Sequence, residues 1–182
     1  MKQHLRIHKA EPNRGILDYS HLLDAPAGKH GFVKTMNGHL YFEDGTRARF
    51  LGFNVATRSN TPDHETADKM AERFASMGVN IIRLHAADAP VGEEPRSWSS
   101  CKEAPLLDYA GGSSRKFNPE GLDRFDYFAA KLKEKGIYLH IDLIVAREFL
   151  PGDDLDYPGG ALSCIKRYAM YNERLIQLQK EY

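Results

Sequence analysis

The sequence has 182 residues, 42% hydrophobic and 27% charged, which is ordinary for about one globular domain with a buried core. Its 25 Lys and Arg residues balance 25 Asp and Glu residues, so no overall charge favours nucleic acid or an anionic membrane as a partner. No apolar run reaches the roughly 20 residues of a membrane span, and residues 1–6 lack the apolar segment of a signal peptide, so we expect a cytoplasmic protein.

The N-terminal part of the chain divides into two regions. Residues 1–30 are polar and rich in turn residues, and we expect an extended lead-in to a domain that spans residues 31–182. Within that domain, Asp44-Gly45 is flanked on both sides by strand-type residues. Asp-Gly favours a hairpin turn, because both central residues of a type I′ turn have positive φ. The second arm of this hairpin continues into residues 50–55, which we predict to be the first core strand.

A helix and a second strand follow. Thr61 offers a capping oxygen and Pro62 suits the first helical position, so we predict that the helix begins there. Apolar residues then recur at helical spacing as far as Gly78, where the helix should end. The apolar run at residues 79–85 predicts a strand joined to the helix by a short loop, as in a right-handed parallel crossover.

The pattern repeats after an irregular segment at residues 91–116. Asn118 predicts the start of a second helix, which ends at Gly136, and residues 137–145 predict a third core strand. A second long loop follows, and residues 166–182 have a helical pattern. The two cysteines have no metal-binding spacing, and the sequence does not decide whether they pair; they are Cys101 and Cys164.

Loop lengths indicate the architecture. The loops after predicted strands are long, whereas those before strands are short. This asymmetry is typical of a (β/α)8 barrel, in which the loops after the strands build the active site. We therefore predict an α/β fold: an N-terminal β-hairpin plus about three βα units of an incomplete TIM-type barrel. A fragment of a doubly wound sheet would look similar, but no glycine-rich phosphate loop follows any predicted strand.

Strand parity assigns side chains to the two faces of the predicted sheet. Arg83 and His85 share one face of the second strand, and His140 and Asp142 share one face of the third. We expect the aliphatic residues opposite them to contact helices, and the polar face to point into the barrel. Arg83 and Asp142 should then lie close enough to pair, or to join through one more polar group. The pair could be an interior ion pair that fixes register, or Arg83 could orient a catalytic carboxylate or bind a sugar hydroxyl. His140 is expected to be a packed structural histidine.

Several side chains at or beyond the strand ends are candidates for substrate contact. Asn54, His85 and Asp88 lie at the rim, and Trp98 is a loop aromatic that could stack on a sugar ring. Each could instead have a structural role, with its polar group hydrogen-bonded to backbone or its ring packed in a local loop core. The histidines near Asp142 form no recognisable metal motif, and we predict neither a metal nor another cofactor.

An ordered series of stretches resembles the N-terminal part of clan-A glycoside hydrolases, the cellulase-like family-five group. The resemblance implies a (β/α)8 barrel that cleaves β-linked glycans with retention, and an arginine, matched here by Arg83, that supports the nucleophile. The family often has a histidine two residues after the aspartate of the third strand, where this chain has Ile144, so one rim hydrogen bond is missing. The matching stretches are residues 31–32, 44–54, 77–85, 106–109, 117–127 and 135–143.

The resemblance also places the catalytic pair outside these 182 residues. In the family, the acid/base glutamate follows the fourth strand and the nucleophile follows the seventh, whereas this chain reaches only about the third unit. Retaining hydrolysis needs two carboxyls roughly 5 Å apart, so we expect a chain that is inactive alone. Its exposed sheet edges predict a homo-oligomer or a missing C-terminal half.

Two further functions stay open. The chain could be a non-catalytic carbohydrate-binding or assembly module that keeps the sugar-facing rim. It could instead be an enzyme of different chemistry that uses His85, Asp88 and Asp142.

Overall fold

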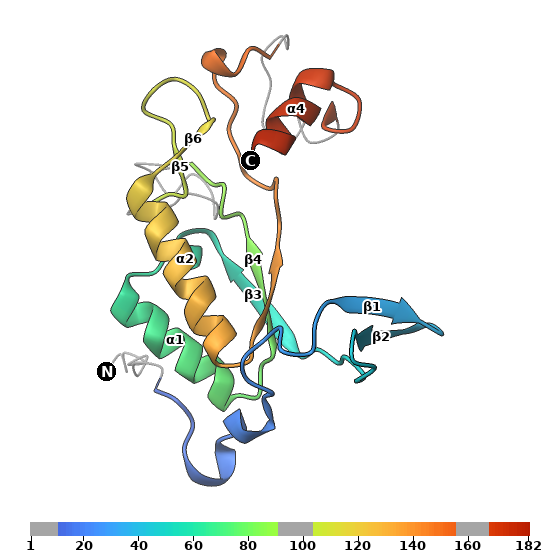
Figure 1. Cartoon of the computed structure of the whole chain (residues 1–182). Helices are drawn as coiled ribbons and strands as arrows, with labels where there is room; N and C mark the ends of the chain where they lie inside the picture. Colours follow the sequence, from blue (N-terminus) through green and yellow to red (C-terminus); the bar gives the residue numbers. More distant parts are fainter. Residues whose placement is uncertain (1–10, 91–103, 156–167) are drawn as a thin grey trace, which may run out of the picture.

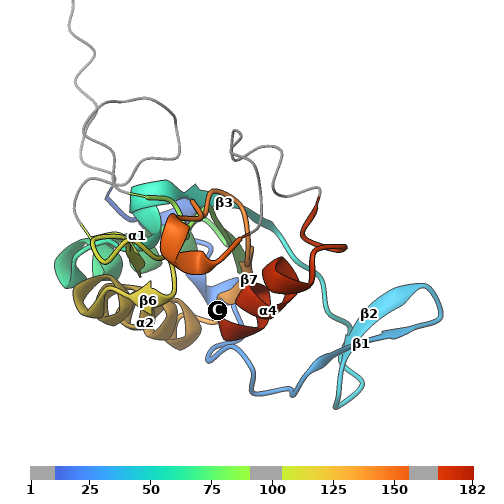
Figure 2. The same ribbon diagram turned by 90° about the horizontal axis from the view of Figure 1, so that it is seen from above.

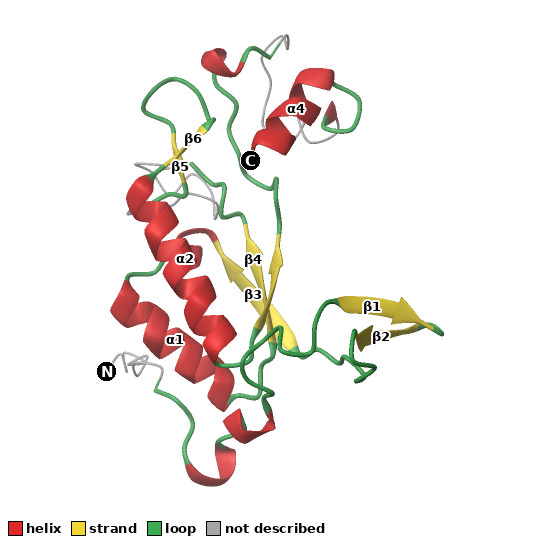
Figure 3. Ribbon diagram, viewed as in Figure 1, coloured by secondary structure: helices red, strands yellow, loops and turns green. Residues whose placement is uncertain are grey.

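A three-stranded parallel sheet lies at the centre of the structure, a computed structural model that describes residues 11–90, 104–155 and 168–182 (Figure 1). Its strands are β3 (Gly52–Ala56), β4 (Ile81–His85) and β7 (Tyr138–Ile141), in that order. Helix α1 (His64–Ser76) connects β3 to β4, and α2 (Pro119–Glu134) leads into β7. Both helices pack on the same face of the sheet (Figure 3), as in a barrel and unlike a doubly wound sheet.

Alternate residues of β4 build the core. Ile82 and Leu84 have no exposed surface, because a strand covered by helices buries every second side chain on the helix side. They pack against α1 and α2, whose contributing residues are Ala67, Ala71, Ala75, Phe128 and Leu132. The aliphatic face of β4 therefore contacts the helices, as predicted.

Helix α2 begins and ends where the sequence predicts, whereas α1 begins two residues later. Asn118 caps α2 by accepting hydrogen bonds from the N–H groups of Glu120 and Gly121. The cap of α1 is Asp63, whose carboxylate accepts from the Thr66 N–H at 2.7 Å. The predicted start at Thr61 is wrong because that buried hydroxyl donates instead to the carbonyl of Ala104.

The N-terminal hairpin forms around a different turn from the predicted one. Strands β1 (Val33–Met36) and β2 (His39–Phe42) pair antiparallel around Asn37-Gly38, and both of these residues have positive φ. The turn at Asp44-Gly45 also forms, with the Phe42 N–H donating to the Thr46 carbonyl at 2.8 Å. Its second arm pairs through a bridge from Tyr41 to Arg47 and through the Ala48 N–H, which donates to the Leu40 carbonyl at 2.9 Å. The predicted pairing around Asp44-Gly45 therefore forms, but over fewer residues than the pairing of β1 with β2.

The lead-in contains short 3-10 turns at Gly15–Leu17 and Ser20–Leu22, and hairpin β1–β2 projects away from the helices (Figure 2). The segment expected to be irregular contains a small ladder between β5 (Leu107–Asp108) and β6 (Lys116–Phe117). At the C-terminus, α4 (Glu173–Glu181) starts later than the predicted helix, because Asn172 caps it by accepting from the Leu175 N–H.

Within the described ranges, no helix is long and apolar enough to cross a membrane. Trp98, Cys101 and Cys164 lie outside the described residues, so the predictions made for them stay predictions.

Candidate functional site

The face of the sheet opposite the helices carries the predicted polar residues in a row across the strands. Strand register places Arg83 between Asn54 of β3 and His140 of β7. His85 lies two residues further along β4, opposite Ala56, and Asp142 follows directly after the end of β7. This face therefore presents an amide from β3, a guanidinium and an imidazole from β4, and an imidazole and a carboxylate from β7 and the residue after it.

Asp142 contacts both Arg83 and His85, and we call these three residues the Asp142 network. Arg83 Nε donates to Asp142 Oδ1 at 3.2 Å, and its terminal nitrogen lies 2.6 Å from Oδ2. His85 Nδ1 lies 2.6 Å from the same Oδ2. The predicted pairing of Arg83 with Asp142 is confirmed, and His85 joins it as a second partner.

The network fixes the charge of the carboxylate and the tautomer of the imidazole. Burial alone would raise the pKa of Asp142, but the hydrogen bonds from His85 and Arg83 outweigh it and hold the pKa below its ordinary value. An ionised carboxylate only accepts hydrogen bonds. Neutral His85 must therefore carry its proton on Nδ1, which leaves Nε2 as the acceptor.

His140 is not the packed residue that the sequence predicted. Its side chain is 61% exposed, and its Nε2 lies 3.5 Å from Asp142 Oδ1, at the edge of the Asp142 network. The prediction is wrong because it assumed a closed barrel interior, whereas in the described residues β7 pairs only with β4 and the polar face stays open.

Asp88 lies inside the protein and not at the rim. It has no exposed surface, and its carboxylate accepts hydrogen bonds from the N–H groups of Val145, Ala146 and Arg147 at 2.7–3.0 Å. These bonds turn the chain away after β7, which is why the strand ends at Ile141 and not at the predicted Val145. Asp88 is thus placed to shape the loop and does not join the Asp142 network.

The remaining candidates lie at different depths. Asn54 is exposed on β3, beside Arg83. Sequence reasoning missed Asn60, which is fully buried just after β3 and donates its amide to the His85 carbonyl at 2.8 Å. Asn60 Oδ1 has no hydrogen-bond partner among the described residues. A polar residue in a predicted loop gives no sequence signal for such burial.

The backbone is strained where β3 and β4 end. Thr57 follows β3 with φ of 54°, and Ala86 follows β4 with φ of 55°. Side-chain-bearing residues rarely adopt positive φ, and such strain is concentrated at functional sites. Both residues lie at the same end of the sheet as His85, the end that forms the active site in barrels.

No protein-family model and no curated protein matches this chain. The chain is similar to a solved structure described as a glycoside hydrolase, with 16% identity and a TM-score of 0.45, over 65% of this chain and 26% of that one. It is also similar to a family 5 glycoside hydrolase from Bacteroides vulgatus ATCC 8482, with 13% identity and a TM-score of 0.46, over 67% of this chain and 26% of that one.

The chain spans about a quarter of the length of these solved structures. Both belong to the class of enzyme that the sequence resembles. The parallel sheet with helices on one face confirms the predicted partial α/β barrel.

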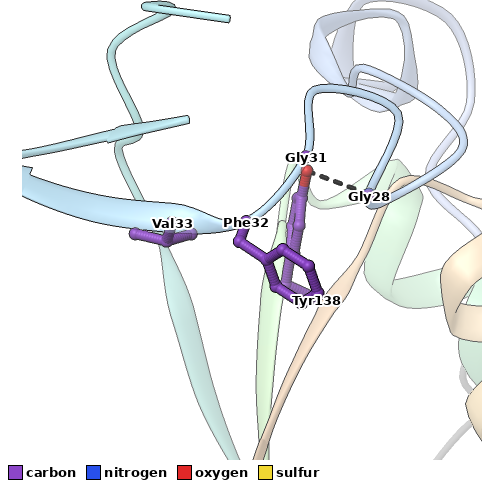
Figure 4. A pocket seen from close by; sticks show the side chains of 5 residues that line it. All are labelled: Gly28, Gly31, Phe32, Val33 and Tyr138. Atoms are coloured by element: carbon purple, nitrogen blue, oxygen red, sulfur yellow. Dashed lines mark hydrogen bonds between the residues drawn. The ribbon is translucent and has the colours of Figure 1, made fainter. Parts of the chain in front are cut away.

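Two apolar pockets lie at the opposite end of β7 from the Asp142 network. One, of about 340 Å³, is lined by Gly28, Gly31, Phe32, Val33 and Tyr138 (Figure 4), where the Gly28 N–H donates to the Tyr138 hydroxyl. A neighbouring pocket of about 320 Å³ lies between the lead-in, α2 and β7. Among the described residues, no three His, Cys, Asp or Glu side chains are grouped so that they could hold a metal ion.

Proposed function

We propose that this chain binds a β-linked glycan on the polar face of its sheet and does not hydrolyse it alone. The observation that carries the proposal is the Asp142 network, in which a guanidinium and an imidazole are held by one carboxylate on an open face. The sequence resemblance to glycoside hydrolases supplies the ligand class.

The chemistry of the network suits a sugar. Sugar hydroxyls both donate and accept hydrogen bonds, and this face offers donors from Arg83 and acceptors from Asp142 within one row. The Arg83 side chain is still 39% exposed although Asp142 holds it in place. Donors that are already ordered lose less conformational entropy on binding.

The lack of hydrolysis follows from the carboxylates. Retaining cleavage needs two carboxyls roughly 5 Å apart. On the polar face of β3, β4 and β7, as far as the chain is described, Asp142 is the only carboxylate, and Arg83 and His85 already occupy it. The glutamates that the resemblance requires would come from a second chain or from a C-terminal half.

The test is calorimetric titration with cellohexaose, laminarihexaose, xylohexaose and mannohexaose, with reducing-sugar release measured in parallel. We expect at least one oligosaccharide to bind without hydrolysis, and Arg83→Ala to abolish binding. Lys34→Ala, in the exposed hairpin, is the control and should bind normally. Absence of binding to all four would refute glycan binding, and sugar release would refute the inactivity.

A further inference from the structure

His30, at the end of the lead-in, is held between two carboxylates, and we call these three residues the His30 bridge. Its Nε2 contacts Asp24 Oδ2, and its Nδ1 contacts Asp44 Oδ2. Asp24 lies six residues earlier in the lead-in, whereas Asp44 lies in the turn that follows β2. A single imidazole therefore closes residues 24–30 into a loop and attaches this loop to the hairpin.

The geometry of the bridge requires a charged imidazole. The Thr46 backbone N–H and His30 hold the pKa of Asp44 below its ordinary value of 3.8, and Lys29 and His30 do the same for the pKa of Asp24. Both carboxylates are therefore ionised near neutral pH and can only accept hydrogen bonds. A neutral imidazole donates through one nitrogen, so His30 donates to both carboxylates only when both of its nitrogens carry protons.

We propose that the His30 bridge is a pH-sensitive switch, which holds the hairpin turn against the lead-in while the imidazole is charged and releases it when the imidazole is neutral. Loss of the proton removes one of the two hydrogen bonds and the positive charge that Asp24 and Asp44 share. The inference goes beyond glycan binding and does not depend on it, because His30 is not part of the Asp142 network.

The other charged groups around the bridge keep their charge across the relevant pH range. They form two ion pairs, from Lys29 to Asp24 and from Lys34 to Glu43. Lysine ammonium groups and carboxylates do not titrate between pH ~6 and pH ~9. Among the described residues, His30 is the only cationic partner of Asp44, so this carboxylate loses its cation when His30 is deprotonated.

The same contacts set the direction of the pH dependence. Hydrogen bonds from His30 to Asp24 and Asp44 outweigh the effect of burial and raise the pKa of His30 above its ordinary value of 6.5. The stability that such a group contributes is complete below its ordinary pKa and is lost as pH rises through the raised one. The bridge should therefore be closed below pH 6.5 and should open in mildly alkaline solution.

Opening should loosen a short stretch without detaching the whole lead-in. The Gly28 N–H still donates to the Tyr138 hydroxyl at 3.1 Å, a bond that does not depend on the charge of His30. Residues 29–31, between this anchor and β1, are the part that would be freed. Because Gly31 also lines the 340 Å³ pocket of Figure 4, the shape of that pocket should change when the bridge opens.

An NMR titration of the histidine ring protons in the 182-residue chain tests the bridge directly. The signal of His30 is assigned by its absence in His30→Gln. We expect its pKa to lie above 6.5 in the parent chain and to fall in Asp24→Asn, which removes one of the two charges that stabilise the imidazolium.

Asp44→Asn is the matched variant, because it can keep the bridge without the charge. Its amide oxygen can still accept from the Thr46 N–H, as Asp44 Oδ1 does at 2.9 Å. Its NH2 group then takes the place of Oδ2 and can donate to the Nδ1 of neutral His30, whose Nε2–H still donates to Asp24. We therefore expect a bridge that stays closed as pH rises.

Trypsin cleavage after Lys29 measures the opening. The cleavage rate at pH ~6 and pH ~9 is divided by the rate for a synthetic peptide of residues 24–33 of the same variant, which cancels the pH dependence of trypsin itself. We expect this ratio to rise about threefold in the parent chain and to stay constant in Asp44→Asn and His30→Gln. His21→Gln, at an exposed histidine of the lead-in, is the control and should behave as the parent.

Three results would overturn the proposal: a His30 pKa at or below 6.5 in the parent chain, a cleavage ratio that does not change with pH, or an equal rise in the parent and in Asp44→Asn. Circular dichroism verifies that the variants fold. The titration of the parent chain needs no variant beyond the one that assigns the signal, so the first result is decisive even if a substitution disturbs the hairpin.

Discussion

The charge on Asp142 holds Arg83 and His85 in place, so the stability that it contributes depends on pH. Its pKa in the folded protein lies below its ordinary value of 3.8, since the hydrogen bonds from His85 and Arg83 outweigh the effect of burial. This contribution is complete above the ordinary pKa and is lost as pH falls through the lowered one. We expect Asp142→Asn to reduce the free energy of unfolding by about 1 kcal/mol at neutral pH.

Urea unfolding of both proteins at neutral pH and near pH ~2 measures this difference, which should largely disappear in acid. Asp126→Asn, on the exposed side of α2, is the control and should change little at either pH. An Asp142→Asn effect of the same size at both pH values would show that the network is held by something other than the charge.

The next prediction concerns Asp88, whose carboxylate has a structural role in the loop after β7. Removing its carboxylate leaves the buried N–H groups of Val145, Ala146 and Arg147 without their acceptor. We expect Asp88→Ala to lower the free energy of unfolding by about 3 kcal/mol. In Asp108→Ala, where one backbone N–H loses its acceptor, the loss should be under about 1 kcal/mol. Equal losses in the two variants would contradict the proposed clamp.

Gly121 lies in the first turn of α2, where we expect glycine to be more stabilising than alanine, contrary to their usual helix propensities. Alanine is normally better than glycine in a helix by about 1 kcal/mol. A Cβ at Gly121, however, would lie 2.1 Å from the Pro105 carbonyl oxygen, a backbone atom that cannot easily move. We expect Gly121→Ala to destabilise the protein by about 2 kcal/mol in thermal or urea unfolding.

Gly111→Ala is the matched control, since a Cβ there meets nothing within 4 Å. It should be neutral within about 0.5 kcal/mol. A stabilised Gly121→Ala variant would mean that the β5 segment can move away from α2 without cost.

The sequence predicted the elements whose signals are local. Asn118 and Gly136 bound α2 correctly, because capping and a positive φ are properties of a few adjacent residues. Strand parity likewise predicted that Arg83 and Asp142 lie close together, and the two side chains are hydrogen-bonded. Asp88 and His140 were misplaced because their environments depend on distant segments: three loop amides in one case, and an open polar face in the other.

For the whole molecule, Tyr138 links parts of the chain that are far apart in sequence. Its hydroxyl accepts from the Gly28 N–H of the lead-in at 3.1 Å. Its ring stacks on Phe42 of the hairpin, with centroids 5.4 Å apart, and meets Phe50 edge-on at 5.5 Å. The projecting hairpin in Figure 1 is thus joined to the sheet by an aromatic cluster at the start of β7.

Two substitutions distinguish the contribution of the Tyr138 ring to stability from that of its hydroxyl. Tyr138→Ala removes the cluster and should cost about 3 kcal/mol, whereas Tyr138→Phe loses one hydrogen bond and should cost about 1 kcal/mol. Limited trypsin digestion should cut after Lys34 and Arg47 sooner in Tyr138→Ala than in the parent chain, because the hairpin loses its anchor. Tyr171→Ala, at a 78% exposed residue, is the control. If digestion of the hairpin were unchanged while overall stability fell, Tyr138 would stabilise the sheet alone, and the hairpin would be held by its other contacts.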